Sequence, residues 1–166
     1  MTINEIQDEI IEEFSGFDDW MDRYSMLIDL GNELPALPAG KRIDQNLIDG
    51  CQSKVWIDAQ VEDGKIVLQG DSDAILVKGI VALLLKVLSG HTPQEILNAD
   101  LYFIGQTGLQ EHLSPTRSNG LLAMVKQIKC TLSPTRPRAH KSDTEVTSYF
   151  LPLTSYFLHL TSPTLL

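Results

Sequence analysis

Residues 55–88 read VWIDAQVEDGKIVLQGDSDAILVKGIVALLLKVL, and they carry the clearest secondary-structure pattern of the chain. Apolar residues alternate along 55–61 and again along 65–70, and the Glu62-Asp63-Gly64 sequence between them is typical of a hairpin turn. The segment from Ala74 to Leu88 is apolar around most of its circumference, as expected of a buried helix. The pattern therefore predicts a local antiparallel hairpin beside a central helix.

Two further helices are predicted before this stretch. Thr2-Ile3-Asn4-Glu5 has the form of a capping box, and the apolar stripe that follows it ends near Gly16. Asp18 is expected to cap a second amphipathic helix, which Gly31 and then Pro35 and Pro38 are expected to stop. The acidic, amphipathic start of the chain does not resemble a secretory signal.

The remaining elements complete an α+β prediction. Residues 43–48 are expected to form a short strand before the hairpin. Thr92-Pro93 and Ser114-Pro115 each predict a helix start, because proline is favoured in the first helical turn. We therefore expect a single compact domain with a small three-stranded antiparallel sheet packed against several helices.

The chain has 166 residues, and its composition changes near the end of the last predicted helix. From Cys130 onward, 16 of 37 residues are Ser, Thr or Pro, and helical periodicity is almost lost. We therefore predict a domain over residues 1–129 and an atypical tail over residues 130–166 that is disordered or poorly packed.

Charge and cysteine content exclude several classes of function. The net charge is −9, and residues 1–129 carry 20 acidic against 10 basic side chains, so direct binding of nucleic acid is not expected. The uncharged apolar run from Gly79 to Leu85 in the predicted domain is too short for a membrane helix. Two cysteines predict neither a disulfide framework nor a metal site. We expect a cytoplasmic protein that binds no metal or cofactor.

Cys51 is the candidate reactive residue. It follows Gly50 at a turn between two apolar runs, where a side chain is presented to a partner. The thiolate is the reactive form, so Cys51 needs help from backbone N–H groups of the turn, from Lys54 or from another cation. The alternative is a small buried hydrophobic residue.

A cysteine hydrolase would need a histidine beside the thiol. The chain has four histidines, at positions 91, 112, 140 and 159. Nothing in the sequence pairs one of them with Cys51, and no protease-type motif surrounds the thiol. Hydrolysis is therefore the less favoured interpretation.

Four motifs, in order and suitably separated, resemble the SufE/CsdE family of sulfur-acceptor proteins. They are Gly50-Cys51-Gln52-Ser53 with Val55-Trp56; Leu68-Gln69-Gly70-Asp71-Ser72-Asp73-Ala74 with Val77-Lys78-Gly79; Thr92-Pro93; and His112-Leu113-Ser114-Pro115-Thr116-Arg117-Ser118 with Gly120-Leu121 and Met124. The resemblance runs from about residue 3 to Lys129. The tail has no counterpart in it.

The resemblance implies a persulfide carrier that acts as an accessory protein rather than as a stand-alone enzyme. Cys51 would take sulfur from a pyridoxal-phosphate cysteine desulfurase, stimulate that enzyme and pass the sulfur to an iron-sulfur cluster scaffold or another receiver. Neither a membrane nor nucleic acid would be a partner. The alternative within the same fold is an activator of the desulfurase that transfers no sulfur.

The resemblance also implies roles for residues around Cys51. Asp71 and Asp73 occupy the family's acidic loop, which gates access to the thiol; their alternative role is to cap the following helix. Arg117 is the candidate cation near the persulfide, or it ties the last helix to an acidic residue. Two neighbours of Cys51 are expected to support it, namely Gln52 and Ser53.

Overall fold

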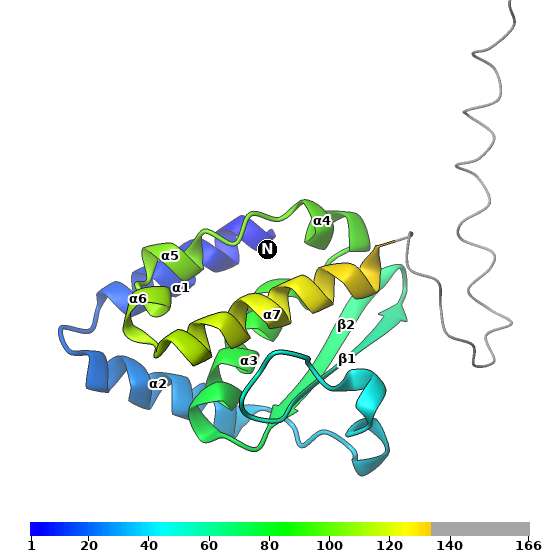
Figure 1. Cartoon of the computed structure of the whole chain (residues 1–166). Coiled ribbons are helices and arrows are strands. Elements are labelled where there is room, and N and C mark those ends of the chain that lie inside the picture. Colours follow the sequence, from blue (N-terminus) through cyan, green and yellow to red (C-terminus); the bar gives the residue numbers. More distant parts are fainter. Residues whose placement is uncertain (134–166) are drawn as a thin grey trace, which may run out of the picture. The chain divides into compact units, whose positions relative to one another are not determined.

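A central helix, α3 (Ile75–Leu88), organises the molecule. In the computed structural model, which describes residues 1–133, α3 packs against α2 (Trp20–Glu33) and against a hairpin of β1 (Val55–Glu62) and β2 (Lys65–Ser72) (Figure 1). Ten of its residues are buried, as its nearly continuous apolar sequence predicts. The expected α+β arrangement of a hairpin on a buried helix is confirmed.

The β1-β2 hairpin forms at the predicted turn. Val55 pairs with Ser72 at one end, and Glu62 pairs with Lys65 at the other. Asp63 and Gly64 form the two-residue turn with φ values of 50° and 77°. Asp-Gly favours this left-handed turn because aspartate tolerates positive φ and glycine adopts it freely.

The expected third strand at residues 43–48 is absent, so within the described residues the sheet has two strands. A 3-10 turn, η2 (Asp44–Asn46), occupies this segment, and Leu47 forms only an isolated bridge with Trp56. The side-chain amide of Asn46 donates to the Lys41 carbonyl at 2.9 Å. Such local side-chain bonds offer the backbone an alternative to a strand ladder.

The first helix, α1 (Ile3–Ser15), has the predicted capping box. The Thr2 side chain accepts from the Glu5 N–H, and the Glu5 side chain bonds to the Thr2 N–H. The expected cap of α2 is one residue in error, because Asp19, not Asp18, accepts from the Met21 N–H at 3.0 Å.

Of the predicted stop signals, Gly31 does not end α2 but lies buried within it at the contact with α3, and the helix ends at Glu33, shortly before Pro35. A Cβ added at Gly31 would lie 2.8 Å from the backbone nitrogen of Gly79, and one added at Gly79 would lie 2.0 Å from the Leu27 carbonyl oxygen. The two glycines therefore let the helix backbones approach closely, and α2 continues to Glu33.

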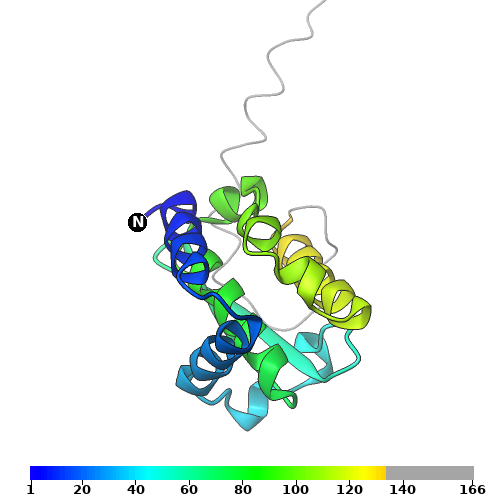
Figure 2. The same cartoon turned by 90° about the vertical axis from the view of Figure 1, so that its left-hand side faces the viewer.

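Within the described residues four helices follow α3, namely α4 (Pro93–Asn98), α5 (Phe103–Gln106), α6 (Leu109–His112) and α7 (Pro115–Leu132). Both predicted Pro-led starts are confirmed; Thr92 forms a capping box, but the Ser114 side chain does not cap. Figure 2 shows α1 and α7 on opposite sides of α3.

The last helix, α7, extends beyond its predicted end at Lys129 and includes Cys130. The predicted tail otherwise falls on residues 134–166, which lie outside the described residues. No helix within residues 1–133 is long and apolar enough to cross a membrane.

Candidate functional site

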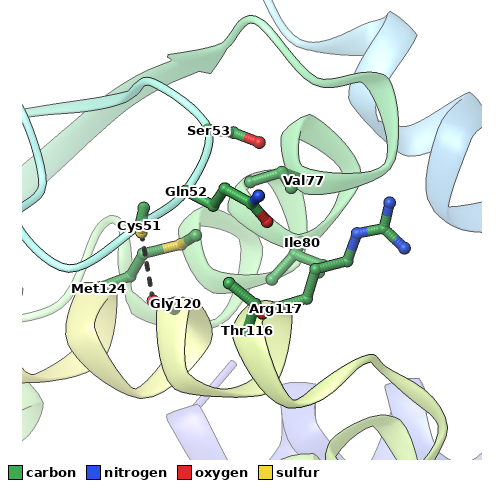
Figure 3. Close-up of a pocket in the computed structure, with 9 residues that line it drawn as sticks. All are labelled: Cys51, Gln52, Ser53, Val77, Ile80, Thr116, Arg117, Gly120 and Met124. Atoms are coloured by element: carbon green, nitrogen blue, oxygen red, sulfur yellow. Dashed lines mark hydrogen bonds between the residues drawn. The ribbon is translucent and has the colours of Figure 1, made fainter.

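Cys51 lies on a loop, residues 43–54, that leads into β1; we call this segment the Cys51 loop. Gly50 has φ +86°, the left-handed conformation that the glycine was expected to supply. The half-buried Cys51 side chain faces α7, and its thiol donates to the Gly120 carbonyl oxygen at 3.6 Å (Figure 3).

A cavity of about 70 Å³ adjoins this thiol. The Cys51 loop, α3 and α7 each contribute to its wall (Figure 3). The lining residues are Cys51, Gln52, Ser53, Val77, Ile80, Thr116, Arg117, Gly120 and Met124. The fold thus brings four of the six expected site residues to one cavity, whereas Asp71 and Asp73 do not line it.

The environment of Cys51 favours the thiol over the thiolate. Burial raises the pKa of the Cys51 thiol, because a charged sulfur is poorly solvated there. Arg117 lines the cavity, but Figure 3 shows its guanidinium directed away from the sulfur. Lys54 is exposed. The expectation that the turn or a nearby cation lowers the pKa of Cys51 is therefore wrong for this conformation.

Asp71 is a buried carboxylate held by two cations. Arg42 donates to one carboxylate oxygen, and Lys78 Nζ lies 3.4 Å from the other. The Ser72 N–H also donates to Asp71 at 2.9 Å. Burial acts to raise the pKa of Asp71, but the Ser72 and Arg42 hydrogen bonds and the charge of Lys78 outweigh it, so the pKa is lowered. Asp71 is therefore ionised.

Asp73 fixes the other end of the Cys51 loop. Its carboxylate accepts from the Lys54 N–H at 3.0 Å, and its own N–H donates to the Lys54 carbonyl at 3.2 Å. Arg42, which pairs with Asp71, precedes the loop directly. Asp71 and Asp73 therefore hold the Cys51 loop from both sides.

The alternative that one of these aspartates caps α3 is wrong. Ala74 occupies the N-cap position, and no side chain caps the helix. Each carboxylate is engaged elsewhere, Asp71 with cations and Asp73 with the Lys54 backbone. The Ser72 hydroxyl accepts from the Ala74 N–H at 3.2 Å instead.

Arg117 is exposed and makes no ion pair with an acidic side chain within residues 1–133. The alternative that it ties α7 to an acidic residue is therefore wrong in the described part. His112, from the same motif, stacks on Trp20 with ring centroids 3.9 Å apart.

Neither described histidine supports a hydrolase. The ring of His112 stacks on that of Trp20, and His91 Nε2 lies 3.3 Å from the Met1 carbonyl oxygen. His140 and His159 lie outside the described residues. Within residues 1–133 no group of three His, Cys, Asp or Glu side chains could hold a metal ion, and the cavity wall offers one thiol and no such cluster.

The sequence motifs contained Val77, Thr116, Gly120 and Met124 but were not used to assign them to the site, and Ile80 was not in the motifs. Thr116, Gly120 and Met124 recur every four residues along α7, so they share one helix face, and Val77 and Ile80 likewise share a face of α3. These spacings were visible in the sequence. Which helix face meets the Cys51 loop depends on tertiary packing, and no local signal pointed to Arg42 as a partner of Asp71.

The chain is similar to several known proteins. Residues 8–132 match the family described as "SufE: Fe-S metabolism associated domain". An uncharacterized SufE-like protein of Rhizobium meliloti (strain 1021) is 42% identical over 127 residues, which cover 74% of this chain and 91% of that protein. The solution structure of a hypothetical protein from Thermus thermophilus is similar with a TM-score of 0.65 and 26% identity, over 76% of this chain and 93% of that one.

Proposed function

This chain belongs to the SufE family, whose domain is associated with Fe-S metabolism, and from that premise we propose that it is a sulfur acceptor. Cys51 takes sulfur from a cysteine desulfurase that uses pyridoxal phosphate, and this removal of sulfur stimulates the desulfurase. The loaded chain then passes the sulfur on for iron-sulfur cluster assembly.

The transfer is an exchange at sulfur. The Cys51 thiolate attacks the outer sulfur of the donor's cysteine persulfide, a bond forms between Cys51 Sγ and that sulfur, and the bond to the donor cysteine breaks. The donor cysteine leaves as a thiolate, and Cys51 becomes a persulfide. The proton that Cys51 first loses goes to solvent or to a base of the donor, so atoms and electrons balance without an oxidant.

The observation that carries the proposal is the position of Cys51, half-buried over a cavity on a loop held from both sides. A buried thiol is protonated and shielded from small oxidants and electrophiles. Attack on a donor protein's persulfide requires the opposite, an exposed thiolate. The Cys51 loop must therefore move when the donor docks.

In this proposal Asp71 and Asp73 gate the loop. Asp71 holds Arg42 before the loop, and Asp73 holds the Lys54 backbone at its end. A donor that competes for either contact would free the loop. Arg117 is exposed at the cavity rim, without an acidic partner among the described residues, and is therefore available to the donor or to the transferred sulfur.

Gln52 and Ser53 have a supporting role in the same proposal. Both lie in the Cys51 loop and line the cavity next to the thiol. When the Cys51 loop leaves the cavity, water can hydrate these polar side chains, so opening would not expose a large apolar segment.

The test is incubation with a cysteine desulfurase and cysteine, with intact mass and sulfide release as readouts. Wild type gains one sulfur atom and stimulates the desulfurase; Cys51→Ser does neither. Cys130→Ser is the matched control, because Cys130 is exposed on α7 and lies outside the cavity, and it behaves as wild type. Full stimulation by Cys51→Ser would contradict sulfur transfer and would favour the non-transferring activator.

A further inference from the structure

The thiol of Cys51 contacts a glycine of α7. Gly120 is buried, and its carbonyl oxygen accepts from the thiol at 3.6 Å. A Cβ added at Gly120 would lie 3.2 Å from Cys51 Sγ and 3.9 Å from Cys51 Cα. Carbon and sulfur at 3.2 Å are closer than a comfortable contact. A side chain at position 120 would therefore displace the sulfur.

We infer that Gly120 is the positioning residue for Cys51, holding the sulfur while it carries a proton and not after it becomes an anion. The inference rests on the proposed function and identifies the residue that keeps the Cys51 side chain in the cavity before it receives sulfur. The missing side chain leaves room for the sulfur, and the carbonyl oxygen can only accept a hydrogen bond. A thiol satisfies this acceptor; an anionic sulfur has no proton to donate and is repelled by the carbonyl dipole.

Loading Cys51 with a sulfur atom converts the thiol into an anion. A persulfide is more acidic than a thiol, so Cys51-S-SH ionises to Cys51-S-S⁻ and releases its proton to solvent. Val77, Ile80 and Met124 supply the apolar part of the cavity wall beside the polar Gln52, Ser53 and Thr116, and a charge that lacks a cationic partner in this partly apolar site is unfavourable. Among the nine lining residues, Arg117 is the one whose side chain carries a fixed charge, and its guanidinium is directed away from the sulfur (Figure 3).

The size of the cavity does not explain why it would hold the Cys51 thiol but not the ionised persulfide. The cavity of about 70 Å³ exceeds the roughly 30 Å³ that one water molecule occupies in the liquid, so it has room for one more sulfur atom. Charge is the property that separates the two states. The cavity therefore retains the empty carrier, and the loaded carrier, once ionised, loses its hold and is presented to a receiver.

The first test is Gly120→Ala in a Cys130→Ser background, so that Cys51 is the only thiol. Alanine is a better helix former than glycine, so α7 is expected to remain folded. The midpoint pH for alkylation of Cys51 by iodoacetamide should fall by about one unit, which makes alkylation about tenfold faster at neutral pH.

Gly105→Ala is the matched control, because a Cβ there meets nothing within 4 Å. It should leave both the alkylation rate and its midpoint at the values of the Cys130→Ser parent. A folded Gly120→Ala chain with the parent's rate and midpoint would overturn the inference.

The second test uses the unsubstituted cavity. The Cys130→Ser chain is loaded with one sulfur by inorganic polysulfide, and amide hydrogen exchange is compared with that of the unloaded chain. Exchange over residues 43–54 should become faster at neutral pH, whereas exchange over 55–72 should not change. Unchanged exchange over 43–54 in the loaded chain would overturn the inference. Neither test contains a desulfurase, so failure of the proposed transfer is recognised separately.

Discussion

Asp71→Asn is the substitution that links the stability of the fold most directly to the Cys51 loop. The change removes the charge that pairs with Arg42 and Lys78 and keeps nearly the same shape. Hydrogen bonds to charged groups contribute about 1.5–3 kcal/mol each. The Asp71 side chain is 4% exposed, but that of Arg42 is 45% exposed, so solvent screening discounts this pair. We expect a loss of about 2 kcal/mol in the free energy of unfolding.

Urea unfolding followed by far-UV circular dichroism measures this loss, and a thermal melt should show Tm lowered by about 4–8 °C. Asp63→Asn is the matched control, because Asp63 is exposed in the hairpin turn and asparagine tolerates its φ of 50°. A double-mutant cycle with Arg42→Ala should show coupling of at least about 0.5 kcal/mol. A free energy of unfolding of Asp71→Asn within about 0.5 kcal/mol of the wild-type value, or strict additivity with Arg42→Ala, would show that the ion pairs of Asp71 do not stabilise the fold.

The effect of Asp71 depends on pH in a defined direction. The folded-state pKa of Asp71 is lowered, so the carboxylate stabilises the fold above the unfolded-state pKa of about 3.9. This contribution disappears as the pH falls through the folded-state value. The difference between wild type and Asp71→Asn should therefore be full at pH 7 and shrink below about pH 4.

Three further outcomes follow from the structure. Gly79→Ala should lower the free energy of unfolding by at least about 3 kcal/mol in urea, because its Cβ would lie 2.0 Å from the Leu27 carbonyl oxygen; a wild-type midpoint would contradict the close helix contact. Gln7→Leu should lose about 2 kcal/mol, because the fully buried Gln7 accepts from the Phe103 N–H at 3.2 Å and leucine leaves that donor unsatisfied; a thermal melt like that of wild type would argue against this. Alkylation of Cys51 should have its midpoint above the ordinary pKa of a cysteine thiol, because burial raises that pKa, and the midpoint should fall when the chain is unfolded in urea; equal midpoints would exclude the buried resting state.

The parts of the fold that the sequence predicted correctly are encoded locally. Asp63-Gly64 fixes the hairpin turn, and Thr2 and Thr92 form capping boxes with partners three residues away. The third strand was predicted wrongly because the apolar pattern of residues 43–48 does not show the bonds that replace strand pairing there, which are the Asn46 bond to the Lys41 carbonyl and the long-range contacts of Lys41. Lys41, for example, bonds to Asp58 at 2.8 Å and to Gln69 at 2.6 Å on the hairpin, and these contacts hold the segment beside the sheet.

The site was predictable in part for the same reason. Cys51, Gln52 and Ser53 are adjacent in the sequence, so their common location followed from one motif. The role of Asp71 depends on Arg42, 29 residues earlier, and on Lys78 in the next helix. The raised pKa of Cys51 comes from burial against α7, which is a property of tertiary packing.

The most direct test of the proposal that Cys51 accepts the sulfur is to find which residue carries the sulfur after transfer. After incubation with a cysteine desulfurase and cysteine, the chain is alkylated and digested with trypsin, which cuts after Arg42 and Lys54 and releases residues 43–54 as one peptide containing Cys51. If Cys51 is the sulfur acceptor, one added sulfur atom is found on this peptide. Sulfur found on the Cys130 peptide instead, or on no peptide while the desulfurase is stimulated, would contradict the proposal.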